Sequence, residues 1–263
     1  MSNDSKPFLE HLEDLRKMLF KSILALILSM GLCLVFVKQI LTLLEHPLAR
    51  AADLKGIKFN EMLIAYTPMS SLNTLMQTAL MGGVIVALPF VLFFIGQFIL
   101  PALTAREKRL LLPTFGIGAL LFLGGVVFCY FLVLPQTLIY LIELGDWINL
   151  RFSWALDEYL SFVVQFLIAF GLSFELPLVI VILAKLGIVS KAFLTRYRRH
   201  SFLIIFVFAT CMMPTTDLFS LMAMAGPMYL LYEISIYCVG WIEKDRARRE
   251  SLDNWEDDYP DNS

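Results

Sequence analysis

The stretch LMQTALMGGVIVALPFVLFFIGQFIL, residues 75–100, carries no charged side chain and decides the fold class. It lies within a longer run, residues 62–105, that lacks Asp, Glu, Lys and Arg, and a second such run covers residues 110–142. About 20 apolar residues in a helix suffice to cross a bilayer core of about 30 Å. The whole chain of 263 residues is 59% hydrophobic and only 17% charged. This is the composition of a membrane protein that crosses the bilayer several times.

Hydropathy predicts an all-α integral membrane protein with six transmembrane helices. The expected spans are residues 22–37, 75–100, 110–134, 159–184, 201–213 and 218–241. The fifth span is short, because its residues rise only about 20 Å in an α-helix. The outer segments 38–73 and 135–158 are expected to be mainly turns and loops, with short helices possible in the first.

Lys and Arg residues are distributed unevenly between the two sides of the predicted bundle. Sixteen of the 21 fall on the side of the two termini, so the positive-inside rule places both termini in the cytoplasm. The chain then divides into a cytoplasmic amphipathic segment (1–21), a six-helix transmembrane domain (22–241) and a disordered acidic cytoplasmic tail (242–263).

The N-terminal segment PFLEHLEDLRKML, residues 7–19, has an apolar stripe at helical spacing. We expect an amphipathic helix that lies at the cytoplasmic membrane surface and runs into the first span. Its charges are either simply solvated or form a binding site. Because anionic lipids favour Lys and Arg, the carboxylates Glu10, Glu13 and Asp14 favour a cationic partner.

Two further acidic residues lie in short connections. Glu107 stands among three basic residues in the first cytoplasmic loop, where it either balances local charge or binds a ligand. Asp217 ends the PTTD turn between the fifth and sixth spans, where it either caps a helix or contacts a partner.

Glu175 is the only charged residue in FGLSFELPLVIVIL, residues 170–183. An acid at the centre of a membrane helix costs about 2.5–3.5 kcal/mol on insertion scales and is usually turned away from lipid. Helical spacing places Gln165 on the same stripe as Glu175, together with Ser161 and Gly171, and Pro177 should weaken the backbone ladder nearby. Glu175 is either a hydrogen-bonded structural residue or an intramembrane polar site. Glu233, in the sixth span, raises the same question.

Motifs of metal, cofactor or catalytic sites do not occur in the chain. The four cysteines lie in apolar runs without CxxC spacing, and the three histidines lie in separate segments. We therefore expect no metal, no cofactor, no enzymatic activity and no nucleic-acid partner.

Several motifs together resemble one family along nearly the whole chain, from about residue 7 to 241. They are FLEHLEDLRKML, TPMSSL, FILPALTAREKRLLLP, YLSFVVQFLIAFGLSFELP, PTTDLFS and GPMYLLYEI. In order and spacing they resemble TatC, the multispanning core subunit of the twin-arginine protein translocase.

The resemblance implies a receptor in a bacterial-type cytoplasmic membrane. Such proteins bind signal peptides with consecutive arginines, recruit TatA- and TatB-type single-span subunits, associate with further copies and export folded proteins using the proton-motive force. It implies a signal-peptide site at Asp14 and Glu107 with Phe98 nearby, an intramembrane polar site at Glu175 and a contact at Asp217. Glu13 stands beside Asp14, so the contact to arginine falls to one of these two carboxylates, and helical spacing adds Gln165 to the Glu175 site. This chain departs from the usual motifs by having Asp14 in place of Glu and PTTD in place of TPPD.

Two other functions remain open. A proton- or ion-coupled small-molecule transporter would use Glu175 and Glu233 as titrating groups, but such proteins usually have two related halves, and none are visible here. A passive structural subunit would leave the cytoplasmic carboxylate motifs without a purpose.

Overall fold

The computed structural model describes residues 8–57, 62–65, 67–99, 105–149, 154–212 and 218–258. Nearly every described element is helical. The elements in chain order are α1 (Phe8–Val35), α2 (Val37–Leu54), β1 (Leu63–Ile64), α3 (Ser70–Ile99), α4 (Ala105–Phe128), the π-helical turn η3 (Cys129–Val133), α5 (Leu134–Trp147), β2 (Trp154–Ala155), α6 (Leu156–Ser173), α7 (Leu176–Lys185), α8 (Lys191–Arg196), α9 (Arg198–Met212) and α10 (Leu218–Asp258).

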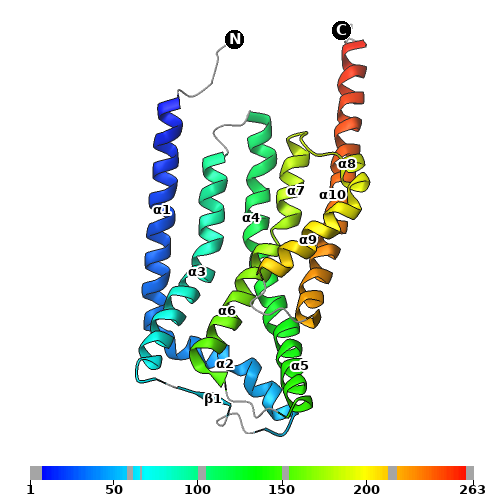
Figure 1. Ribbon diagram of the computed structural model, residues 1–263. Coiled ribbons are helices and arrows are strands. Elements are labelled where there is room, and N and C mark those ends of the chain that lie inside the picture. Colours follow the sequence, from blue (N-terminus) through cyan, green and yellow to red (C-terminus); the bar gives the residue numbers. More distant parts are fainter. Residues whose placement is uncertain are drawn as a thin grey trace.

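The long helical stretches stand side by side in a bundle, and α9 runs obliquely across it (Figure 1). Five of them are long and apolar enough to cross a membrane: Leu12–Val35, Ser70–Phe98, Gly116–Trp147, Leu156–Lys185 and Ser220–Asp245. The sixth is α9, whose 15 residues confirm the short fifth span. The start of α1 and the end of α10 lie at the same end of the bundle, here called the inner end, and the opposite end is called the outer end (Figure 1).

The predicted amphipathic helix runs directly into the first span. It forms the first turns of α1, which is one helix of 28 residues standing beside α3 (Figure 1). Sharp kinks need a proline, a glycine or a bulge, and residues 8–30 contain neither proline nor glycine. The charged first turns therefore continue the axis of the span.

The outer end contains more regular secondary structure than the sequence predicts. The segment 38–73 contains α2, an 18-residue helix that crosses the foot of the bundle from α1 and packs on α5 (Figure 1). The third span does not end at residue 134, because α4 passes through η3 into α5 and continues to Trp147. Two-residue strands then join the outer segments: β1 pairs in parallel with β2, and the Trp154 N–H donates to the Met62 carbonyl at 2.7 Å.

The fourth span is broken where the sequence predicts weakness. Helix α6 ends at Ser173 and α7 begins at Leu176, with Pro177 in its first turn, where the missing N–H of a proline is tolerated. Helix α7 ends at Lys185, and Gly187 follows two residues later with a φ of 76°, which suits a residue without a side chain. Ser190 then caps α8, because its Oγ accepts a hydrogen bond from the Phe193 N–H at 3.1 Å.

The core is centred on α6 and also takes buried side chains from α2, α5, α7 and α10, whereas α1 packs almost entirely on α3. Three phenylalanines, Phe122, Phe166 and Phe170, are fully buried at the α4–α6 contact. The last helix differs from the prediction of a disordered tail after residue 241, because α10 continues without interruption to Asp258.

Candidate functional site

The break between α6 and α7 places Glu175 inside the bundle. Glu175 precedes the first residue of α7 and is only 7% exposed. Neither of its carboxyl oxygens has a hydrogen-bond partner among the residues that the structure describes. Buried polar groups without partners are rare in folded proteins, so each one calls for an explanation. In this arrangement the side chain has unused hydrogen-bonding capacity.

A glycine on α4 makes room for this carboxyl group. A methyl group added at Gly118 would stand 3.1 Å from Glu175 Oε2 and 2.6 Å from Leu178 Cδ2. A second close approach follows two turns later, where a methyl group at Gly125 would meet the Phe170 carbonyl at 2.8 Å. The bare backbone of α4 therefore forms one wall of the Glu175 site. In the sequence this wall corresponds to Gly118 and Gly125, which lie seven residues apart on α4. A hydropathy analysis does not detect such a spacing.

Both carboxyl oxygens of Glu175 are sealed from the surface. A ligand or partner therefore reaches them only after the helices separate or the side chain turns.

The structure does not bring the two predicted members of the intramembrane site together. Gln165 is exposed on α6, whereas Glu175 is buried beyond the end of that helix. Ten residues separate them, which is about 15 Å along a helix axis. The polar stripe is thus interrupted, and its other predicted members have local roles: Ser161 accepts a hydrogen bond from Gln77 on α3, and Gly171 packs against Phe122.

The residues of the expected signal-peptide site lie at the inner end. Glu13 is exposed and forms an ion pair at 2.8 Å with Lys17, one turn further along α1. Asp14 is half-buried on the same helix, and Phe98 is half-buried near the end of α3. Glu107 lies in the first turn of α4, but its side chain is outside the described part of the chain, as is the whole of Asp217. The inner ends of α1, α3 and α4 stand in a row (Figure 1).

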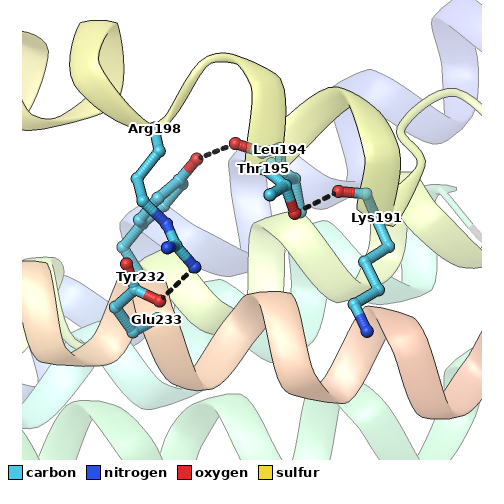
Figure 2. Close-up of polar contacts among 6 residues, drawn as sticks. All are labelled: Lys191, Leu194, Thr195, Arg198, Tyr232 and Glu233. Atoms are coloured by element: carbon cyan, nitrogen blue, oxygen red, sulfur yellow. Dashed lines mark hydrogen bonds and ion pairs between the residues drawn. The ribbon is translucent and has the colours of Figure 1, made fainter.

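Glu233 has a partner that the sequence did not predict. Arg198, at the start of α9, donates a hydrogen bond of 2.9 Å to Glu233 Oε2 on α10. Figure 2 shows this pair beside the hydroxyl of Tyr232, which donates to the Leu194 carbonyl at 2.8 Å. These contacts fasten α8 and the start of α9 to α10. Glu233 therefore has a structural role in this arrangement. This agrees with the first of the two interpretations that the sequence left open, a hydrogen-bonded structural residue.

The fold and the sealed carboxyl group define a multi-pass helical membrane protein with a polar site inside its bundle. Comparison with known proteins identifies which one. The family model described as "Sec-independent protein translocase protein (TatC)" matches residues 10–227. The chain belongs to the TatC family.

Relatives of that description cover most of the chain. The protein from Koribacter versatilis is 35% identical over 93% of this chain and 89% of its own length, and that from Aquifex aeolicus is 36% identical over 88% of this chain and 93% of its own. The relative from Akkermansia muciniphila is 36% identical, and the match spans 62% of its length. A solved structure described as "Crystal Structure of Twin Arginine Translocase Receptor- TatC" aligns over 88% of this chain and 98% of its own, with a TM-score of 0.74 and 35% identity.

Proposed function

We propose that this protein is the receptor and core subunit of a twin-arginine translocation complex. It would bind signal peptides with consecutive arginines, recruit TatA- and TatB-type single-span subunits and export folded proteins using the proton-motive force. We place it in a bacterial-type cytoplasmic membrane with both termini in the cytoplasm, because sixteen of its 21 Lys and Arg residues lie on the side of the termini.

One observation carries the proposal: the likeness to the solved twin-arginine translocase receptor extends over 88% of this chain and is accompanied by 35% identity. The family model matches residues 10–227, a range that includes the inner ends of α1 and α3 and the break at Glu175.

The inner end supplies the chemistry that an arginine pair needs. A guanidinium group donates two parallel hydrogen bonds to one carboxylate, so two arginines are best met by two carboxylates, and Lys cannot reproduce this geometry. We propose that one carboxylate comes from α1, either Glu13 or Asp14, and the other from Glu107 at the start of α4. Glu13 must release Lys17 to take part, because the two form an ion pair at 2.8 Å.

The Glu175 site has a different part in this proposal. Its carboxyl oxygens have no partner among the described residues, and a polar side chain of a partner helix could provide the missing hydrogen bonds inside the membrane. Asp217, which lies between α9 and α10 in the sequence, would contribute a second partner contact.

The test is binding of the detergent-solubilised protein to a signal peptide with Arg-Arg, compared with the same peptide carrying Lys-Lys. We expect tight binding to Arg-Arg, a loss of at least tenfold with Lys-Lys, and a similar loss with Glu107→Ala. Of Glu13→Gln and Asp14→Asn, the variant with the larger loss identifies the carboxylate on α1. Glu143→Gln is the matched control, because it removes a carboxylate from the outer end of the same protein. Equal binding of both peptides by the unaltered protein would contradict the proposal.

A further inference from the structure

A proline interrupts the helix that braces the outer end. Pro47 lies inside α2, ten residues after the helix begins at Val37. Proline has no N–H, so the carbonyl four residues earlier, that of Leu43, loses its donor in the helical ladder. Near a membrane a freed carbonyl is costly, because little water is available to replace the donor.

A tyrosine from another helix supplies a donor to this carbonyl. The Tyr130 hydroxyl donates a hydrogen bond of 2.7 Å to the Leu43 carbonyl, although the two residues are 87 positions apart in the sequence. That bond has the length of a good O–H···O contact. It goes to the one carbonyl of α2 whose donor Pro47 has removed.

The local structure around Tyr130 is also unusual. Tyr130 lies in η3, the π-helical turn between α4 and α5, in which the Leu134 N–H donates to the Cys129 carbonyl five residues earlier. Pro135 follows directly and cannot donate to the helix. Single π-helical turns inside α-helices are rare and frequently mark functional positions. Here the turn carries the tyrosine that reaches across to α2.

A second tyrosine contacts the next carbonyl but in a different situation. The Tyr159 hydroxyl, on α6, donates to the Leu44 carbonyl at 2.7 Å, and Tyr159 is only 3% exposed. The ring of Tyr159 stacks on Trp154 of β2 at 6.3 Å. Leu44 would ordinarily be paired with the N–H of Leu48, which is present. Tyr159 therefore reinforces α2, whereas Tyr130 replaces a donor that is missing.

We propose that Tyr130 is a positioning residue whose hydroxyl takes the place of the main-chain donor removed by Pro47, and that this bond fastens the outer helix α2 to the transmembrane bundle. The proposal is independent of the signal-peptide site. In this proposal the Tyr130 hydroxyl acts together with the Tyr159 hydroxyl and the buried side chains of α2 in holding this helix between α1 and α5.

A double-mutant cycle tests the substitution of one donor for the other. Tyr130→Phe removes only the hydroxyl, and Pro47→Ala restores an N–H at position 47 that can donate to the Leu43 carbonyl. The readout is amide hydrogen exchange of peptides from α2 in the detergent-solubilised protein. We expect Tyr130→Phe to speed this exchange about tenfold when Pro47 is present and less than twofold in the Pro47→Ala background.

Tyr159→Phe is the matched control, because Pro47→Ala adds no donor for Leu44. Its effect should be the same in both backgrounds. Equal effects of Tyr130→Phe in both backgrounds would overturn the proposal, as would rescue of Tyr159→Phe to the same extent. If Tyr130→Phe does not fold alone, folding of the Tyr130→Phe/Pro47→Ala protein supports the proposal, and failure of both proteins to fold overturns it.

Discussion

The wall of the Glu175 site can be tested by adding single methyl groups to α4. Gly118→Ala places a methyl group 2.6 Å from Leu178 Cδ2 and 3.1 Å from Glu175 Oε2. Gly116→Ala, half a turn away on the same helix, meets nothing within 4 Å. Both changes gain the same intrinsic helix propensity, about 0.8–1.0 kcal/mol. The difference between them therefore measures the contact alone.

The size of that difference follows from the packing. Overpacking a filled interior costs about 1–3 kcal/mol, and each kcal/mol moves the melting temperature of a chain of this size by about 2–4 °C. We thus expect Gly118→Ala to melt about 2–12 °C below Gly116→Ala. The assay is the loss of monodisperse protein on heating in detergent, followed by size-exclusion chromatography.

A second pair of glycines on α4 predicts which substitution lowers the melting temperature most. Gly125→Ala would meet the Phe170 carbonyl at 2.8 Å, and a main-chain atom cannot move aside as a leucine side chain can, whereas Gly124→Ala meets nothing within 4 Å. The expected order of melting temperatures places Gly116→Ala and Gly124→Ala highest, Gly118→Ala lower and Gly125→Ala lowest. Equal stability of Gly118→Ala and Gly116→Ala would refute the inferred contact.

Two further predictions concern the carboxyl groups within the bundle. Glu175→Gln keeps the shape and hydrogen-bonding capacity of the side chain, so we expect substantial export activity from it and much less from Glu175→Ala; full export by both would make Glu175 a packing residue only. Arg198→Gln and Glu233→Gln each remove one half of a partly exposed ion pair, whose side chains are 44% and 23% exposed, so each should lower stability by about 1 kcal/mol or less and leave export intact. Loss of export by Glu233→Gln alone would instead indicate a direct role in transport.

The transmembrane spans could be predicted from the sequence because hydropathy is a local property. Composition along the chain indicates six spans, of which the fifth in chain order is short. The structure has the five long spans and, as α9, the short one. The outer helices α2 and α5 could not be predicted in the same way. These segments make contacts with parts of the chain that are distant in sequence. One example is the ion pair between Lys55 of the first outer segment and Glu143 of the second.

The candidate site was only partly predictable for a related reason. The residue types and their positions along α6 indicated a polar intramembrane residue, and Glu175 is indeed buried. Helical spacing alone could not show that Gln165 faces the surface while Glu175 is buried. Nor could it show that Gly118 of another helix closes the space around the carboxyl group.

The prolines explain why helix breaks are hard to read from this sequence. Pro89 and Pro227 lie inside α3 and α10 without ending them, whereas Pro177 begins a new helix and leaves Glu175 at the break. Every such proline removes one donor and crowds the preceding turn. Whether the helix then continues depends on what surrounds the freed carbonyl, and that is a property of the assembled bundle. At Pro47 the carbonyl receives the Tyr130 hydroxyl and α2 continues. Two polar features of this bundle, the Leu43 carbonyl and the Glu175 carboxyl group, therefore owe their position to a neighbouring proline, whereas the pair of Arg198 and Glu233 does not.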